Sequence, residues 1–407
     1  MADKFAFTIK YMQKQIGSLV ALLVVLVSFV SSSVAHAAGE VKKPWTMLVY
    51  LNGNNSLDQF GAMNLKQMQQ YGSSDQLNIV VQWASLSASD TKRLYVQKDP
   101  SATSVTSPVV QTLPVLDMGD KATLMDFIKW GVANYPAEHY FIVVWNHGSG
   151  WHLKSLDGGS IKITDISYDD RSGHHISTEE LGQAMAEASA IIGHKVDLYG
   201  SDACLMSMIE VASEMKDSVE SFVGSEEVEP GDGWPYHLFL KKWSANPTAT
   251  SKEVGSYLAE AYKEYYVGQN ETGATMSVLD MSQLDALSAS ISALKDSLLT
   301  HTDFSAIKTA AESATRYESQ DYVDLQDVLE KVSASLTGTD SASTAILSVK
   351  QQIAKTVVSA QTSGKVANGI AIWWPTEQYD WSGYSARYKG LKFDQASHWS
   401  DFLQKMF

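Results

Sequence analysis

The sequence contains a single cysteine, Cys204, among 407 residues. One cysteine excludes an intramolecular disulfide and any zinc site built from several thiolates. Proline and glycine are not abundant, at 9 and 26 residues, and 44% of the residues are hydrophobic against 19% that are charged. This balance is typical of a globular protein and excludes collagen-like, coiled-coil and wholly disordered chains.

Basic residues are outnumbered by acidic ones. The chain has 31 Lys and Arg against 46 Asp and Glu, which gives a formal net charge of −15. Binding to a nucleic-acid backbone needs clustered positive charge. The charge balance therefore predicts no nucleic acid among the partners, and it is better suited to basic partners.

The N-terminus has an apolar run at residues 19–30, shorter than the ~20 residues that a membrane-spanning helix needs. Three lysines precede this run, and an Ala-x-Ala pattern at 35–37 follows it. These features predict a signal peptide over residues 1–37, with cleavage after Ala37 and a secreted or periplasmic product. We expect no stable membrane association once the segment is removed. An uncleaved anchor is the alternative.

Short apolar runs alternate with helical patterns after Pro44. Near-continuous apolar strands predict a buried, largely parallel sheet flanked by helices, which is an α/β fold. An additional antiparallel strand is predicted at 93–96. The predicted strands are 45–51, 77–83, 139–145, 196–200 and 221–225, and the predicted helices are 57–71, 123–134, 178–192 and 206–216.

The composition changes near residue 251, where Ala, Ser and Leu become frequent. Residues 251–407 are predicted to form a mostly helical C-terminal region. A strand near 369–374 is expected there, returning to the sheet. The helices predicted in this region are 251–267, 281–300, 304–317, 322–336 and 341–363.

Two predicted strands end in residues that can carry chemistry. The strand at 139–145 is followed by His147 and Gly148, and the strand at 196–200 is followed by Asp202 and Cys204. In an open parallel sheet, ligands bind outside the carboxyl ends of the strands. A thiol nucleophile needs a partner that handles protons. Gly148 leaves its N–H group free of side-chain bulk to face a developing oxyanion.

These segments resemble the clostripain-like cysteine peptidases, which belong to the same clan as caspases, legumains and gingipains. The resemblance extends over nearly all of the chain that follows the predicted signal peptide. It rests on six ordered segments: WTMLVYLNGNNSLD (45–58), VWNHGSGW (144–151), DLYGSDACLM (197–206), SEEVEPGDGWPY (225–236), DLQDV (324–328) and GIAIWWP (369–375).

The resemblance implies a caspase-like catalytic domain at 38–250 and cleavage of proteins or peptides after Arg or Lys. His147 and Cys204 match the catalytic pair of the family. The histidine is expected to polarise the scissile region and to protonate the leaving amine. By analogy, the oxyanion would be bound by the backbone N–H groups of Gly148 and Cys204.

Asp202 is predicted to bind the side chain that precedes the scissile bond. Side chains alternate along an extended chain, so those of Asp202 and Cys204 point the same way. A carboxylate beside Cys204 disfavours the thiolate unless a cation lies next to that carboxylate. We therefore expect cationic ligands to activate Cys204 by neutralising Asp202. Asp232 is a second pocket candidate, because family loops at this place line the same pocket. The alternatives are a helix cap for Asp202 and a turn residue for Asp232.

The polar segment 152–176 is long for a loop, and long loops are often functional. The resemblance implies self-cleavage between His147 and Cys204. The candidate bonds follow Lys162 or Arg171, and then Lys154.

The same segment contains a histidine and aspartate cluster, but its spacing matches no zinc or EF-hand pattern. We expect a solvated acidic loop and assign no metal site. No cofactor is required by the sequence, although the resemblance implies calcium stimulation. The cluster consists of Asp165, Asp169, Asp170, His174 and His175.

Two other functions compete with the peptidase. The first is a catalytically idle caspase-like binding protein, whose helical C-terminal region docks a partner. The second is a serine hydrolase that uses Ser149 or Ser201, but neither serine lies in the Gly-x-Ser-x-Gly pattern. A lone cysteine is often an inert core residue. The intact histidine and cysteine segments favour the peptidase.

Overall fold

The computed structural model describes residues 42–152, 165–301, 304–336 and 341–407. From Lys43 to Phe407 the chain packs as one unit. The predicted signal peptide at 1–37 lies outside the described residues. None of the helices in the described ranges has the length and apolar character needed to cross a membrane.

The described residues form a nine-stranded sheet with the order β10-β8-β7-β6-β5-β1-β2-β3-β4. The five strands from β7 to β2 in this order are parallel, and the strands outside them pair antiparallel. The strand bounds are β1 Lys43–Gly53, β2 Leu77–Ser85, β3 Thr91–Tyr95, β4 Val109–Leu113, β5 Ala137–Trp145, β6 Val196–Asp202, β7 Val219–Gly224, β8 Thr275–Asp280 and β10 Val357–Thr362.

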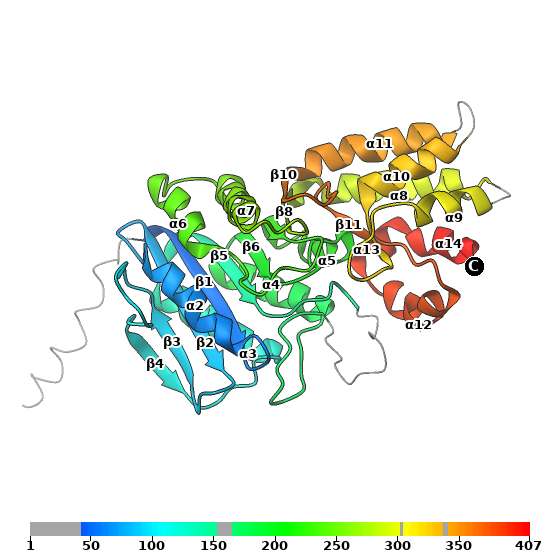
Figure 1. Cartoon of the computed structure of the whole chain (residues 1–407). Coiled ribbons are helices and arrows are strands. Elements are labelled where there is room, and N and C mark those ends of the chain that lie inside the picture. The colour runs from blue at the N-terminus through cyan, green and yellow to red at the C-terminus, as the bar shows by residue number, and fades with distance from the viewer. Residues whose placement is uncertain (1–41, 153–164, 302–303, 337–340) are drawn as a thin grey trace, which may run out of the picture. The chain divides into compact units, whose positions relative to one another are not determined.

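Helices cover both faces of this sheet (Figure 1). Along β1, Leu48 and Tyr50 join one buried cluster, while Met47 and Val49 join the other. This alternation explains why the central strands are apolar on both sides. The first cluster includes residues of α3 Lys121–Asn134, α4 Thr178–Ile192 and α5 Ile209–Met215. The second includes residues of α2 Asp58–Gln69, α6 Tyr236–Ala245 and α7 Ser251–Gly268.

Residues 251–407 are largely helical, as predicted, but they also supply β8 and β10 to the main sheet. The division of the chain at residue 250 stays a prediction. The remaining elements are η1 Met281–Gln283, α8 Leu284–Leu298, α9 Ser305–Glu312, β9 Tyr322–Asp324, α10 Leu325–Ser335, α11 Ser341–Thr356, β11 Ala371–Trp373, α12 Gln378–Tyr388, α13 Lys392–Ser397, α14 Trp399–Leu403 and η2 Gln404–Met406.

The expectation that the strand near 369–374 returns to the main sheet is wrong. Instead, β11 pairs antiparallel with β9 in a separate two-stranded sheet. Its N-terminal residue also contacts the segment after Cys204, because the Ala371 N–H group donates a hydrogen bond to the Ser207 carbonyl. The strand that does return from the C-terminal region to the main sheet is β10, which pairs with β8.

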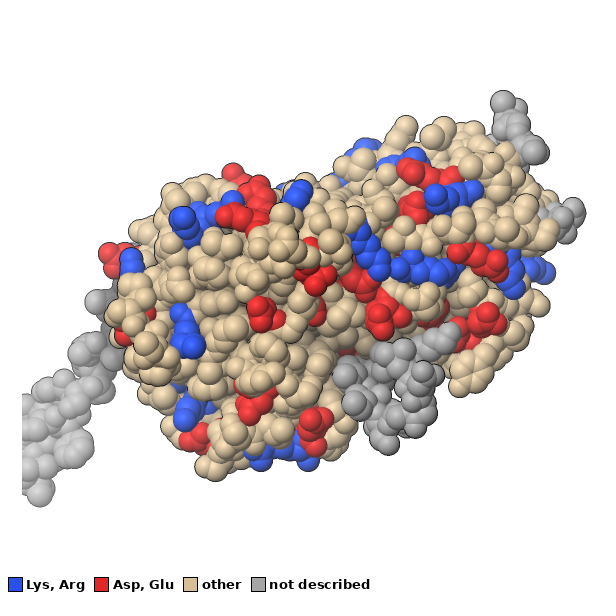
Figure 2. Space-filling view, in the orientation of Figure 1, with Lys and Arg blue, Asp and Glu red and all other residues tan. Residues whose placement is uncertain are grey.

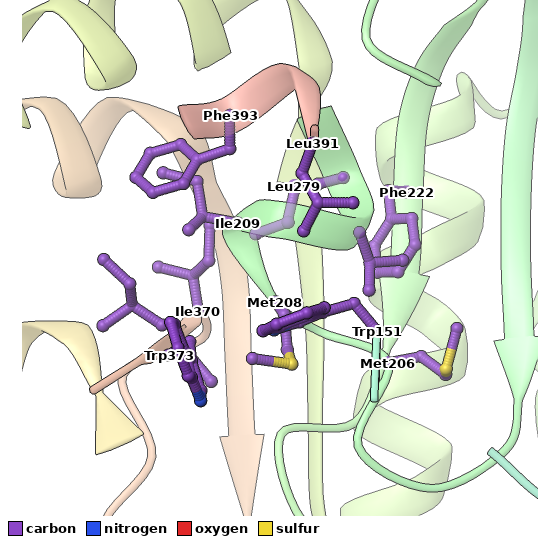
Figure 3. Packing of buried hydrophobic residues seen from close by; sticks show 14 of the residues in the cluster. Trp151, Met206, Met208, Ile209, Phe222, Leu279, Ile370, Trp373, Leu391 and Phe393 are labelled. Carbon is purple, nitrogen blue, oxygen red and sulfur yellow. The ribbon is translucent and has the colours of Figure 1, made fainter. Parts of the chain in front are cut away.

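An apolar cluster joins this C-terminal strand to the segments that follow β5 and β6. The Trp151 and Trp373 rings pack edge to face, with centroids 5.2 Å apart. Figure 3 shows Trp151 beside Met208, with Trp373 on the other side of that methionine. Both segments that carry the predicted catalytic pair are therefore anchored in one buried core.

On the face seen in Figure 2, Lys and Arg side chains of the described chain are scattered among Asp and Glu. The acidic excess of the sequence is thus spread over this face among basic residues. Some of these charges are paired, as between Lys242 and Glu260, whose closest charged atoms are 3.3 Å apart.

Candidate active site

The carboxyl ends of β5 and β6 lie side by side, and they place the two predicted catalytic residues at one edge of the sheet. Trp145 and Asp202 are aligned in the parallel pair. The Asn146 N–H group extends the pairing by donating to the Asp202 carbonyl at 3.2 Å. His147 is the residue after Asn146, and Cys204 lies two residues after Asp202.

A cavity of about 210 Å³ opens at this edge, and His147, Asp202 and Cys204 all line it. Leu57 closes it from the segment after β1. The opposite wall comes from the segment after β7, through Val228, Glu229, Pro230, Gly231 and Gly233. The structure therefore brings together the two predicted catalytic residues and one of the two predicted pocket acids.

His147 is half-buried, and its Nε2 lies 2.9 Å from the Ser56 hydroxyl oxygen. Burial lowers the pKa of His147, and the charge of Asp170 opposes this shift. The imidazole is therefore biased toward its neutral form, which holds one proton and offers one acceptor nitrogen.

Gly148 is packed directly against the segment that contains Cys204. A Cβ atom at this position would lie 2.6 Å from the Cys204 carbonyl oxygen and 3.0 Å from the Ala203 Cβ. Real side chains do not approach a backbone oxygen so closely, so only glycine fits without a shift of one strand end. The oxyanion role of the Gly148 and Cys204 N–H groups stays a prediction.

Cys204 is partly exposed at the cavity, and its sulfur is held by the opposite wall. The Glu229 N–H group lies 3.3 Å from Sγ, and the Glu229 carbonyl oxygen lies 3.9 Å from it. Burial and the charge of Glu229 raise the pKa of Cys204 to about 12. The thiol is consequently protonated in the unliganded protein at neutral pH.

The next residue, Leu205, has a φ of 64°, which is rare for a residue with a branched side chain. Its N–H group donates to the Glu227 carbonyl at 3.2 Å. This bend ends the strand direction of β6 directly after Cys204. Backbone strain of this kind is concentrated at functional sites in proteins.

Asp202 is buried, with 4% of its surface exposed, and both of its carboxylate oxygens are hydrogen-bonded. Oδ1 accepts from the Trp234 N–H group at 3.1 Å, and Oδ2 accepts from the Tyr236 hydroxyl at 2.8 Å. Burial raises the pKa of Asp202, and the Tyr236 hydrogen bond opposes this effect. Asp202 does not cap α5, which begins only at Ile209 without a side-chain cap.

Asp232 is not among the residues that line this cavity, although its neighbours Gly231 and Gly233 are. Its Oδ2 accepts a hydrogen bond from the Tyr265 hydroxyl at 2.7 Å. Its role as a pocket residue stays a prediction.

Sequence reasoning missed Glu229, which lines the cavity beside both Asp202 and Cys204. Its side chain is buried, with 8% of the residue surface exposed. Burial and the neighbouring Asp202 carboxylate raise the pKa of Glu229 well above its usual range. The signal was present in the segment at 225–236, which contains several acids of which only Asp232 was selected.

The predicted self-cleavage positions are only partly visible. Lys154 and Lys162 lie outside the described residues. Arg171 is exposed, and its guanidinium donates to the Ala88 carbonyl at 2.8 Å. Asp165, which follows the undescribed stretch, is buried and paired with Arg387 at 2.6 Å.

In the described part of the acidic segment, charged side chains are held by individual polar contacts. Within the described ranges, no group of three or more His, Cys, Asp or Glu side chains is arranged to hold an ion. Asp169 instead accepts from the Asn54 side-chain amide at 2.8 Å, and His174 pairs with Asp117. Calcium stimulation stays an expectation without assigned ligands.

The two serines weighed as nucleophiles are buried. Ser149 and Ser201 are 1% and 0% exposed, and neither lines the cavity. The Ser201 hydroxyl lies 2.9 Å from the hydroxyl of Tyr199. A serine hydrolase at this edge of the sheet is not supported by this placement.

Comparison with known proteins identifies one family. The sequence model of the clostripain family matches residues 49–405 of the chain. Clostripain from Hathewaya histolytica is 23% identical over 404 residues, which cover 83% of this chain and 76% of that protein.

Two solved structures share the fold. One is a secreted C11 cysteine protease from Bacteroides thetaiotaomicron in complex with an irreversible peptide inhibitor. Its TM-score is 0.66 at 22% sequence identity, and the match covers 88% of this chain and 99% of that protein. An inactive zymogen C11 protease from Parabacteroides distasonis gives a TM-score of 0.68 at 20% identity, with coverage of 88% and 99%. The predicted fold class is thereby confirmed.

Proposed function

The chain belongs to the clostripain family of cysteine peptidases, and on this premise we propose that it cuts peptide bonds after Arg or Lys with His147 and Cys204. The sequence resemblance to this family and the prediction of a cysteine endopeptidase are confirmed by the family match. The basic specificity, the roles of the two residues and self-processing are the parts proposed here.

The observation that carries the proposal is the shared cavity. The only thiol of the chain, the imidazole of His147 and the buried carboxylate of Asp202 come from adjacent parallel strand ends and line one space. Ligands of open parallel sheets bind at this edge. The cavity has room for a side chain of a bound peptide, with the thiol at its wall.

The reaction follows from these groups. The Cys204 sulfur attacks the scissile carbonyl carbon as its proton passes to His147, and a thioester forms as the carbon–nitrogen bond breaks and His147 gives this proton to the leaving amine. His147 then accepts a proton from the water that hydrolyses the thioester and returns it to the Cys204 thiolate that is released. The N–H groups of Gly148 and Cys204 stabilise the negative oxygen of the tetrahedral intermediates.

Basic specificity follows from the charge of the cavity wall. Asp202 is buried beside a second acid, Glu229, and two negative carboxylates there are costly unless a cation lies beside them. An Arg or Lys side chain that enters the cavity provides this cation. A neutral side chain of similar size leaves the carboxylate uncompensated and is expected to be a poor substrate.

The test is hydrolysis of fluorogenic peptides that differ only before the scissile bond, with Arg, Lys, or citrulline as the uncharged analogue of Arg. The protein is the chain without residues 1–37, compared with Cys204→Ala and His147→Ala. We expect each variant to lose about a thousandfold or more in kcat/KM. Equal turnover by Cys204→Ala would refute the proposal, and so would equal turnover of the citrulline peptide.

We further propose export through residues 1–37 and self-cleavage after Lys162, Arg171 or Lys154. N-terminal sequencing of the aged wild-type protein should give a second start within 155–172, and Cys204→Ala should remain a single chain. An intact wild-type chain with full peptidase activity would refute self-processing. The idle binding protein is supported instead if neither peptide cleavage nor self-cleavage occurs.

A further inference from the structure

Three of the segments that carry the sequence resemblance meet at a buried place that the proposed reaction does not use. They contribute Glu226 from 225–236, Asp324 from 324–328 and Gly369 from 369–375. Glu226 and Asp324 have 2% and 0% of their surfaces exposed, and their carboxyl groups are hydrogen-bonded to each other. Two carboxylates in contact away from water cannot both be ionised without a cation, so the pair holds a proton.

The other hydrogen bonds of the pair indicate which carboxyl group holds this proton. Asp324 Oδ1 accepts from the Asp327 N–H group at 2.7 Å, and its two oxygens also accept from the Asn368 side-chain amide and N–H group at 2.9 Å and 2.6 Å. Glu226 has one backbone donor, the Gly369 N–H group, at 2.7 Å from Oε2. An ionised carboxylate only accepts, whereas a protonated one can donate. Asp324 is therefore the acceptor within the pair, and Glu226 is the donor.

The surroundings of Glu226 agree with this assignment. Burial and the charge of Asp324 raise the pKa of Glu226 well above its usual range. The Tyr317 hydroxyl lies 3.0 Å from a Glu226 oxygen and 3.4 Å from an Asp324 oxygen, so it is in contact with both acids.

The charged groups close to the pair are engaged by other partners. Lys365 lies over the Tyr317 ring, but its ammonium pairs with Glu227. On the side of β8 the pair meets the uncharged Thr275 hydroxyl, which accepts from the Glu226 N–H group at 3.1 Å. A proton thus compensates the two acids where the described residues direct their lysine elsewhere.

Backbone contacts transmit the position of Glu226 to the thiol through the wall segment, residues 225–236. The Glu227 carbonyl accepts from the Leu205 N–H group at 3.2 Å, and the Glu229 N–H group lies 3.3 Å from the Cys204 sulfur. Glu226 precedes Glu229 by only three residues. A displacement of the acid pair therefore shifts the part of the wall segment that contacts the sulfur.

We propose that Glu226 and Asp324 share one buried proton and act as a positioning pair that holds the wall segment against Cys204. Neither acid lines the cavity, so neither is a catalytic residue. Loss of the shared proton leaves two adjacent negative charges, whose repulsion releases the wall segment from the sulfur. The inference rests on the proposed function for its effect on turnover, but its effect on the thiol is independent of that function.

The first experiment uses the single thiol of the chain as a reporter. Glu226→Ala removes the donor of the pair, whereas Glu226→Gln keeps the shape and replaces the acid proton by an amide N–H. We expect iodoacetamide to alkylate Cys204 about threefold or more faster in Glu226→Ala at neutral pH, because a released wall relieves the burial and the Glu229 charge that raise the pKa of the thiol. Glu226→Gln should restore the wild-type rate.

Asp324→Asn is the second arm of this experiment. It turns an amide N–H2 group toward donors that the carboxylate accepts, so it should accelerate alkylation as Glu226→Ala does. A wild-type rate in Asp324→Asn with a fast rate in Glu226→Gln would place the proton on the wrong acid and overturn the assignment. Equal rates in Glu226→Ala and the wild type would overturn the inference as a whole, even if Asp324→Asn does not fold.

The second experiment tests the proton by thermal unfolding. A carboxyl group whose pKa is raised in the folded protein gives its full stability below the pKa of the unfolded chain, and this stability is lost as the pH rises through the folded pKa. The unfolding temperature of Glu226→Gln minus that of the wild type should therefore increase by about 2 °C or more between about pH 5 and pH 9. Glu138→Gln, a matched control at an exposed position of β5, should show a constant difference. A constant difference in Glu226→Gln would refute the shared proton.

Peptide hydrolysis separates this inference from the proposed function. We expect kcat/KM for Arg peptides to fall about tenfold or more in Glu226→Ala and to return to within about threefold of the wild type in Glu226→Gln, because the amide restores the position of the wall. If alkylation and unfolding behave as predicted but the wild type cleaves no peptide, the proposed function is refuted and the positioning pair stands. If the wild type cleaves peptides and Glu226→Ala lowers only the unfolding temperature, the pair has a merely structural role and this inference is refuted.

Discussion

Two regions build the active site by different means. The strand ends that carry His147 and Cys204 are fixed by the parallel pairing of β5 with β6 and by glycine at their contact. The opposite wall, residues 225–236, belongs to no strand and is held by individual hydrogen bonds to Asp202, Cys204 and Leu205. Under the proposed function, the sheet sets where the chemistry occurs, whereas the wall sets which side chain is accepted.

The largest effect should come from breaking the contact between the strand ends. Gly148→Ala introduces a Cβ that would lie 2.6 Å from the Cys204 carbonyl oxygen. We expect kcat/KM to fall about a hundredfold or more, because a displacement of roughly 1 Å is enough for such a loss. The loss should be equal for Arg and Lys peptides, and circular dichroism should show a folded protein. A fall limited to one substrate would contradict the division of roles.

An intermediate effect is expected in the wall. Tyr236→Phe removes the hydroxyl that donates to Asp202. Hydrogen bonds to charged groups contribute ~1.5–3 kcal/mol, so KM for Arg peptides should rise by about tenfold or more, with a smaller change in kcat. Steady-state kinetics separate the two constants. A fall in kcat alone would show that the wall also positions the reacting groups.

The pH dependence should distinguish the two regions as well. Burial raises the pKa of Asp202, so this carboxylate takes up its proton at a higher pH than an exposed aspartate. Because the protonated form cannot pair with a cation, kcat/KM for Arg peptides should fall as the pH decreases through this raised pKa. Citrulline peptides should lack this limb of the profile. Identical profiles for the two substrates would exclude an ionised acid in recognition.

The smallest effect is expected at Ser56, which contacts the His147 imidazole from the segment after β1. Ser56→Ala should lower kcat by about two- to fivefold, since a neutral hydrogen bond contributes ~1 kcal/mol or less and this serine is exposed. Pre-steady-state measurement of product release would locate the loss in acylation or deacylation. A loss as large as that of Gly148→Ala would assign Ser56 to the catalytic machinery.

The sequence predicted the central strands well because they are buried on both faces and therefore read as continuous apolar runs. It missed β4, whose residues are largely exposed, and β8, which carries polar residues among its apolar ones. It also placed β10 in a helix, because α11 ends at Thr356 and the strand begins at the next residue without a glycine or proline between them.

The site was predicted unevenly for a related reason. His147 and Cys204 follow β5 and β6, and Asp202 is the last residue of β6, so the sheet alone brings the three residues to one edge. Between the end of β7 at Gly224 and the start of α6 at Tyr236 the chain is irregular, so the alternation of side chains along a strand does not predict which acid faces the cavity. The surroundings of Asp232 and Glu229 are distinguished only by their contacts: Asp232 accepts a hydrogen bond from Tyr265, and the Glu229 backbone N–H group lies against the Cys204 sulfur.

The contribution of β8 and β10 has a consequence for any shortened form of the protein. A fragment that stops at residue 250 would retain His147 and Cys204 but would leave β7 as an unprotected border of the sheet, with its N–H and C=O groups unpaired. Such borders recruit strands from other molecules. We therefore expect this fragment to precipitate rather than to serve as a minimal peptidase.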